Sequence, residues 1–257
     1  MIQLGSEFID TAPLWAFILL FSRFTGLFFA LPGIGTEAVP PPFRFYAAVI
    51  MSFVVSLTGV KAPEAKGALE QMLMVFSELS LGFALGLIPT FILGGLAVAG
   101  QVISGAIGLG QANMIDRSLG VSVALLAKLK MSIATVVFLM LDGHHLLIRV
   151  AAGVPGELGL GLMRNYADAA QLFTEQLVQS FELAAMVSAP ILVTTLITQF
   201  IFGLLTKFVP QVNIFIVSLP LGLLIGFFII AHGLTGFVNL VIRHFAGMEE
   251  SILRLMS

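Results

Sequence analysis

From Leu79 to Ile115 no residue carries a formal charge, and this stretch is longer than one helix needs to cross a membrane. A helix that crosses the hydrocarbon core perpendicularly takes about 20 mostly apolar residues. The rest of the chain is similarly apolar: 58% of its 257 residues are hydrophobic and 10% are charged, whereas soluble domains have about 25% charged residues. The sequence therefore predicts a membrane protein, with something other than a simple crossing in this stretch.

The few charged residues are nearly balanced, which limits the classes of function. Lys and Arg number 12 against 14 Asp and Glu, so the chain offers no basic field to nucleic acid. It contains no cysteine, which excludes a disulfide framework, a thiolate metal site and a Cys nucleophile. The N-terminal segment carries Glu7 and Asp10 in place of a basic leader, and we expect it to be retained.

Apolar runs of spanning length predict an all-α membrane protein with about six long helices. They are separated by turn-forming or charged residues, and internal prolines predict kinks in three of them. The expected segments are about Ala12–Leu31, Phe43–Gly59, a third from Leu69 that contains Pro89, Val121–Ile148, Leu183–Thr206 with Pro190, and Val212–Ile242 with Pro220. Residues 156–182 have mixed charges and an apolar spacing that suits a partly wet helix, and we expect no soluble domain there.

Small residues recur four positions apart, a spacing that lets helix backbones approach closely in membranes. The spacing fits helix packing within the chain and, alternatively, packing against another subunit. The residues are Gly82 and Gly86, then Gly100, Ser104 and Gly108, then Gly222 and Gly226.

The stretch GAIGLGQANMIDRSLG, residues 105–120, separates two long apolar runs. Its glycines break a helix, and its polar side chains cannot face lipid. It is either a loop at the bilayer surface or a re-entrant plug that lines an aqueous path. The long uncharged approach favours the plug, in which Met114 and Ile115 would supply a compliant apolar seal. The candidate plug residues are Gly105, Gly108, Gly110, Gln111, Asn113, Met114, Ile115, Asp116 and Arg117.

Three cations lie within apolar segments, where each is costly unless it pairs, snorkels or faces water. Arg23 lies in the middle of its segment, so we expect a buried partner or a contact with another subunit. Lys128 and Lys130 are two positions apart and therefore on different helix faces. For these two lysines a position near a helix end is the simpler interpretation.

The sequence LDGHHLLIR places Asp142, His144 and His145 at the far part of an apolar segment. Asp142 and His145 can share a helix face, whereas adjacent histidines are expected to point in different directions. A structural or interface role near a helix end, a role in gating or pH response, and metal binding all remain open. No phosphate loop, HExxH or GxSxG motif is present, so no catalytic site is predicted.

Four segments, in this order along the chain, resemble the FliR family of flagellar type III export gates. They are SRFTGLFFALPGIGTEAVPPPFRFYAAVIMS, LGFALGLIPTFILGGLAVAGQVISGAIGLGQANMIDRS, LDGHHLLI and FVPQVNIFIVSLPLGLLIGFF. In the first of them, a Pro-rich turn is followed by Arg44. Their order and spacing are more specific than any single motif. One departure is the segment near Met114, where typical members have a more Phe- or Pro-containing sequence.

The resemblance implies a non-enzymatic subunit of the flagellar type III export gate in the bacterial inner membrane, at the basal body. It implies assembly with FliP and FliQ, contacts with FlhB and FlhA, and passage of unfolded export substrates through a pore surrounded by lipid. Residues 1–182 would be a FliP-like part and 183–257 a FliQ-like hairpin within one membrane domain. Neither a cofactor nor a metal is implied.

The family likeness also implies roles for residues of this chain. Residues 105–117 would form the plug of the closed channel. The cytosolic hairpin tip would contain Lys207, Pro210, Gln211 and Asn213. Buried polar or interface positions would be Arg23, Arg44, Lys128, Lys130, Asp142, His144 and His145.

Three other interpretations remain open. A virulence-type secretion gate would share the same architecture. A small-solute secondary transporter could use the proline-broken helices and the buried charges. An intramembrane enzyme would depend on Asp142 and His145.

Overall fold

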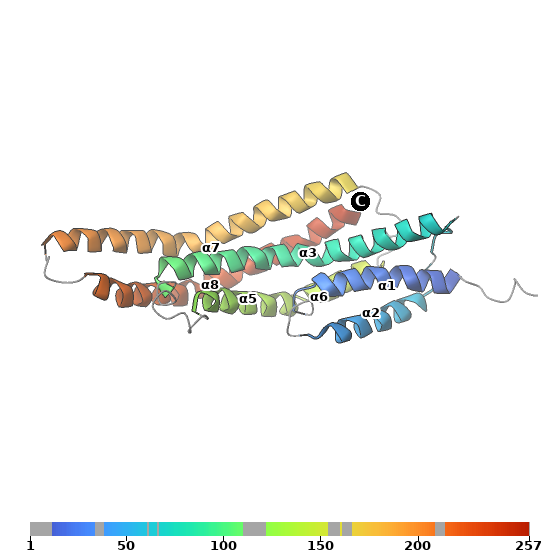
Figure 1. The fold of residues 1–257 in the computed structure, drawn as a ribbon, viewed down its shortest axis with the longest axis horizontal. Helices are drawn as coiled ribbons and strands as arrows, with labels where there is room; N and C mark the ends of the chain where they lie inside the picture. Colours follow the sequence, from blue (N-terminus) through green and yellow to red (C-terminus); the bar gives the residue numbers. More distant parts are fainter. Residues whose placement is uncertain are drawn as a thin grey trace, which may run out of the picture. The chain divides into compact units, whose positions relative to one another are not determined.

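The computed structural model describes residues 12–33, 39–60, 62–65, 67–109, 122–153, 160, 166–208 and 214–256. Within these ranges the only regular secondary structure is helical (Figure 1), which confirms the predicted all-α class. The helices are α1 (Ala12–Ala30), α2 (Pro41–Ser56), α3 (Ala68–Ala106), α5 (Ser122–Met140), α6 (Gly143–Ala151), α7 (Tyr166–Phe208) and α8 (Ile214–Met256).

Among the described residues, three helices are long and apolar enough to cross a membrane. They are α3 over its whole length, Phe173–Phe208 of α7 and Pro220–Glu250 of α8. The helices α5 and α6 together make a fourth candidate that is broken by a bend of 61°, and α1 and α2 are shorter apolar helices. The expected apolar segments thus correspond to α1, α2, α3, the α5–α6 pair, α7 and α8.

The predicted boundaries are wrong at two places. The fourth segment, expected to be continuous from Val121 to Ile148, is broken after Met140, because Asp142 adopts a left-handed conformation that a helix cannot continue through. The fifth segment was expected from Leu183, but α7 begins at Tyr166 and continues through it. The helix predicted within residues 156–182 is thus confirmed from Tyr166 onward, where residues 166–182 contain neither Gly nor Pro. The proposed division of the chain after Glu182 therefore falls inside a continuous helix, and it stays a prediction.

The described residues form two compact units. Unit 1 takes its residues from Met1–Thr90, Asp142–Phe173 and Gly247–Ser257, and unit 2 from Phe91–Leu141 and Thr174–Ala246. The helix α3 passes from unit 1 to unit 2 after Thr90, the residue that follows Pro89, its one internal proline.

The core of unit 1 forms around α1, which packs against α2 and α6. Side chains of α1 such as Leu19, Phe24 and Leu27 are fully buried. The first part of α3 lies so close to α1 that a Cβ atom on Gly82 would overlap the carbonyl oxygen of Arg23. A Cβ on Gly86 would lie 2.6 Å from the Cβ of Ala30. The small residues here therefore serve close helix packing within the chain.

Unit 2 contains α5, the end of α3 and most of α7 and α8. Gly95 and Gly100 of α3 lie against the backbones of Ser180 and Ala127, and Gly226 of α8 lies against Ile107. Only 22% of the most apolar part of α7 and 11% of that of α8 is buried. These exposed apolar surfaces require lipid or another subunit to cover them.

Candidate functional site

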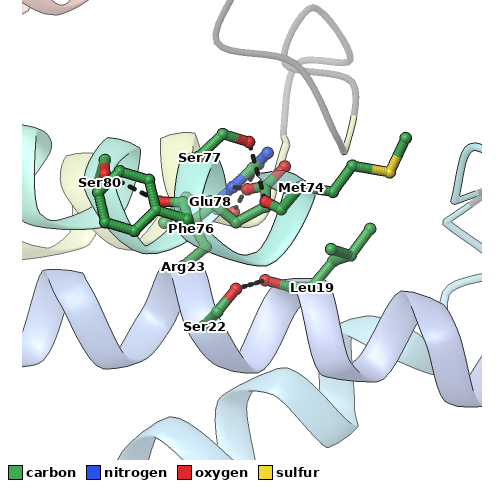
Figure 2. A network of polar contacts seen from close by, with 9 residues as sticks. Leu19, Ser22, Arg23, Met74, Phe76, Ser77, Glu78 and Ser80 are labelled. Carbon is green, nitrogen blue, oxygen red and sulfur yellow. Dashed lines mark hydrogen bonds and ion pairs between the residues drawn. The ribbon is translucent and has the colours of Figure 1, made fainter. Parts of the chain in front are cut away.

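A buried ion pair links three helices of unit 1 (Figure 2). The guanidinium of Arg23 on α1 donates through Nε to Oε2 of Glu78 on α3, and the two side chains are 1% and 2% exposed. The Nη1 atom of Arg23 also donates to the carbonyl oxygen of Ala151, near the end of α6, over 3.2 Å. Of the two alternatives expected for Arg23, a buried partner or a contact with another subunit, the structure shows a buried partner, Glu78.

The hydroxyl groups beside this pair are satisfied within their own helices. Ser22 donates to the carbonyl oxygen of Leu19 over 2.8 Å, and Ser77 donates to that of Met74 over 2.9 Å, as Figure 2 shows. When two opposite charges are buried together, their mutual attraction offsets part of the free energy that it costs to remove each of them from water. The pair thus fixes α1, α3 and α6 to one another at a point where a single charge would not be tolerated.

Arg44 stabilises the start of α2. Its Nε and Nη2 atoms donate to the carbonyl oxygen of Val39 over 3.0 and 2.8 Å. Its guanidinium also lies 5.7 Å from the centre of the Phe29 ring. The arginine therefore joins the residues before α2 to the end of α1 through hydrogen bonds and a cation–π contact.

The break between α5 and α6 brings three polar side chains together. Asp142 has a φ of 55°, and its Oδ1 lies 2.9 Å from Nδ1 of His145. This contact confirms that Asp142 and His145 share a face. The expected divergence of the two histidines is wrong, because their ring centres are 4.0 Å apart. Side chains in a helix point toward its N-terminus, so both rings can lie over the N-terminal turn of α6.

The same three residues offer ligand atoms within 4.8 Å of one another, although Asp142 and His145 are exposed. The Nδ1 atom of His144 is buried and has no hydrogen-bond partner among the described residues. The arrangement leaves structural, gating and metal-binding roles open for this cluster.

Substituting Asp142 by Gly is expected to raise the free energy of unfolding by up to about 1 kcal/mol, because Gly removes the cost of a left-handed residue. Asp142→Val is the matched control and is expected to be destabilising, since a β-branched residue tolerates a positive φ poorly. Unfolding midpoints of both purified variants in detergent would check this. A loss of stability in both variants would show that the carboxylate contact with His145 outweighs the backbone strain.

The candidate plug begins at the end of α3, and of its candidate residues the structure describes only Gly105 and Gly108. The α-helix ends at Ala106, and Gly108 has a φ of 90°, which favours glycine. The remaining candidates lie outside the described residues, namely Gly110, Gln111, Asn113, Met114, Ile115, Asp116 and Arg117.

A cavity of about 80 Å³ in unit 2 adjoins this helix end. Gly105 and Gly108 line it from α3, with Thr195, Thr198 and Gln199 from α7 and Ser218 from α8. The polar residues on α7 were not predicted from the sequence. Their signal is the run TTLITQ within an apolar helix, in which Thr195 and Thr198 are three positions apart and so share a face.

The two lysines of α5 differ in their surroundings. Both lie within α5 rather than at its end, which is not the expected position. Lys128 is exposed, whereas Lys130 is buried with its Nζ 4.4 Å from the centre of the Phe237 ring. At the proposed hairpin tip, Lys207 is exposed in the last turn of α7, and Pro210, Gln211 and Asn213 lie outside the described residues.

Comparison with known proteins places the chain in one family. Residues 14–248 match the family described as bacterial export proteins, family 1. The flagellar biosynthetic protein FliR of Caulobacter vibrioides is 30% identical over 90% of this chain and 93% of its own length. FliR of Aquifex aeolicus is 27% identical over 89% and 88%. The surface presentation of antigens protein SpaR of Shigella flexneri is 24% identical over 82% of each chain.

The match extends from within α1 to within the last part of α8, so it includes the buried ion pair, the α5–α6 break and the end of α3. Since one family model accounts for nearly the whole chain, this protein belongs to family 1 of the bacterial export proteins.

Proposed function

We propose that this chain is a structural and gating subunit of the flagellar type III export gate. It helps to form the pore through which unfolded flagellar proteins are secreted. The observation that carries this proposal is the likeness to FliR of Caulobacter vibrioides, which extends over 93% of that protein at 30% identity. The chain contributes no catalytic step, so energy for export comes from other components.

The apolar surfaces of α7 and α8 support assembly with other subunits. FliP and FliQ are the proposed neighbours in one hetero-oligomer, with FlhB and FlhA adjoining it. The complex lies in the bacterial inner membrane at the flagellar basal body. In this arrangement residues 1–182 are the FliP-like part, and residues 183–257 are the FliQ-like hairpin whose tip faces the cytosol.

The end of α3 supports a gating role. Irregular backbone at membrane depth is stable only where protein or water surrounds it. The hydroxyl and amide groups of the cavity beside Gly105 and Gly108 provide such surroundings. The proposed plug, residues 105–117, continues from this point and closes the pore until a substrate is exported.

Native mass spectrometry tests the assembly. The chain would be expressed alone and together with FliP and FliQ from the same operon, in mild detergent. We expect a discrete hetero-complex that contains one copy of this chain. A stable monomer or homodimer that does not bind FliP and FliQ would contradict the proposal and favour a small-solute transporter.

Deletion of Gly110–Arg117 is expected to leave the complex assembled and to make the membrane leak ions, because the pore then lacks its seal. Conductance of cells or of reconstituted bilayers that contain the deleted complex provides the measurement. A matched control replaces the same residues by a Gly/Ser linker of equal length, which keeps the connection and removes the seal. Unchanged conductance in an assembled complex would contradict the plug.

A virulence-type secretion gate is the second candidate, because the relative from Shigella flexneri is named for the surface presentation of antigens. Complementation distinguishes the two. The chain is expected to restore flagellar export in a host that lacks FliR and to fail in a host that lacks SpaR. The reverse result would assign it to the virulence system.

A further inference from the structure

Unit 2 contains an apolar pocket of about 630 Å³ between α5, α7 and α8. Its walls include Ile133 from α5, Met186, Pro190 and Ile191 from α7, and Phe237 from α8. This volume lies in the range of pockets that hold a whole ligand or several side chains. The pocket is thus large enough for part of a helix from another chain.

One cation lines this otherwise apolar pocket. Lys130 is 6% exposed, and its ammonium lies over the ring of Phe237. Among the described residues it forms no ion pair, and the only other titratable group in the lining is His232, whose Nδ1 lies 3.2 Å from the carbonyl oxygen of Phe228. One aromatic face compensates only a small part of the cost of burying an ammonium group. The pocket is therefore complementary to a negative charge.

The position of the pocket along its helices decides which kind of anion can reach it. Lys130 lies near the middle of α5, and the lining residues 186–191 and 228–240 lie near the middle of the apolar spans of α7 and α8. Lipid phosphates lie outside the hydrocarbon core, beyond the ends of such spans. A carboxylate on a membrane-embedded helix can reach this depth, where charged side chains pair with one another.

The surroundings of the pocket also suit a helix. The faces of α7 and α8 that line the pocket carry exposed apolar side chains, namely Met186 and Phe228. A helix that entered the pocket would continue along these faces and cover them. Its residues on either side of the carboxylate would be apolar, to match the walls.

We propose that this pocket receives a membrane-embedded helix of a partner subunit that carries one Asp or Glu near its middle, and that this carboxylate pairs with Lys130. The proposal rests on the proposed function, because it requires a hetero-oligomeric gate. In this proposal Lys130 takes part in the assembly of the gate, whereas Lys128, two positions away, does not.

The first test compares Lys130→Met with Lys128→Met, each co-expressed with FliP and FliQ. Both changes remove one ammonium from α5, but only the first removes it from the pocket. We expect Lys130→Met to reduce the fraction of gate complexes that contain this chain at least tenfold, as counted by native mass spectrometry. Lys128→Met is expected to stay within twofold of the unmodified chain.

Lys130→Arg separates a loss of charge from a failure to fold, since it keeps the cation. We expect it to recover at least half of the incorporation. A photo-crosslinking residue in place of Ile133 then identifies the occupant by the mass of the crosslinked peptide. We expect a peptide from another subunit that contains an Asp or Glu within one helical turn of the crosslink. Replacing that acidic residue by Lys in the partner, together with Lys130→Glu in this chain, is expected to restore incorporation.

The outcomes separate the two proposals. If the unmodified chain forms no complex, the proposed function fails and the pocket assignment fails with it. If the complex forms and Lys130→Met incorporates as well as Lys128→Met, the pocket assignment alone is overturned. Crosslinking to phospholipid, or to a peptide without an acidic residue, also overturns it.

Discussion

Replacing Arg23 by Met is expected to lower the free energy of unfolding by about 3–5 kcal/mol, because Glu78 is then left charged in a buried site without the guanidinium. The change also removes the hydrogen bond from Nη1 to the carbonyl oxygen of Ala151, which links α1 to the end of α6. The purified chain, in detergent with or without its partners, would be unfolded with denaturant to measure the difference.

The double variant Arg23→Met with Glu78→Leu isolates the electrostatic part of this effect. Replacing a whole buried ion pair by apolar residues of similar volume is often neutral, so we expect the double variant to recover most of the lost stability. Lys128→Met is the control for removing a cation from an exposed position of an apolar helix, and it is expected to change stability by less than about 0.5 kcal/mol.

A small effect of Arg23→Met, equal to that of Lys128→Met, would contradict the buried pair. A double variant that is as unstable as the single one would show that the geometry of the guanidinium, rather than the charge of Glu78, holds the three helices together.

The requirement for a partner of Arg23 could be predicted from the sequence, but the identity of that partner could not. A cation in the middle of an apolar run must be compensated. Glu78 is far away in sequence, however, and lies in a segment whose register against the first helix depends on tertiary packing. The carbonyl oxygen of Ala151 was beyond prediction for the same reason.

The glycine spacing predicted close helix packing, but not which helices would meet. Four-residue spacing is the same for packing within a chain and between chains. The structure shows that Gly82 and Gly86 lie against α1. Whether the exposed faces of α7 and α8 serve other subunits is a separate matter, because patterns of apolar residues do not distinguish lipid from protein.

The break at Asp142 was present in the sequence as the dipeptide Asp-Gly, which is a turn signal. The surrounding apolar residues made a continuous span the simpler interpretation. The backbone shows that the turn signal outweighs the apolar pattern here, since Asp142 takes a positive φ and α6 begins at the next residue. For the plug, the sequence supplied the glycines, whereas the hydroxyl groups of α7 beside them emerged only from the fold.

Gly82→Ala is expected to lower the free energy of unfolding by about 3 kcal/mol, the upper end of the usual cost of overpacking. The new methyl group would overlap the carbonyl oxygen of Arg23, and the amide nitrogen of Leu27 would lie 3.0 Å away. These are backbone atoms, so no side chain can rotate out of the way and α1 would have to move from α3.

Gly94→Ala is the matched control on the same helix. Nothing lies within 4 Å of a Cβ at Gly94, so the change gains only the better helix propensity of Ala, worth up to about 1 kcal/mol. The two substitutions are chemically identical and are expected to shift the unfolding midpoint in opposite directions. A stabilising Gly82→Ala would contradict the close approach of α1 and α3.

Coupling between the two main predictions gives a stricter test. A methyl group at Gly82 presses on the backbone of Arg23, the residue whose side chain pairs with Glu78. The effects of substitutions at residues in contact are not additive. Gly82→Ala combined with Arg23→Met should therefore lower the free energy of unfolding by less than the sum of the two single changes, with a difference of at least about 0.5 kcal/mol. Strict additivity would mean that the helix approach and the ion pair stabilise unit 1 independently, although they share one residue.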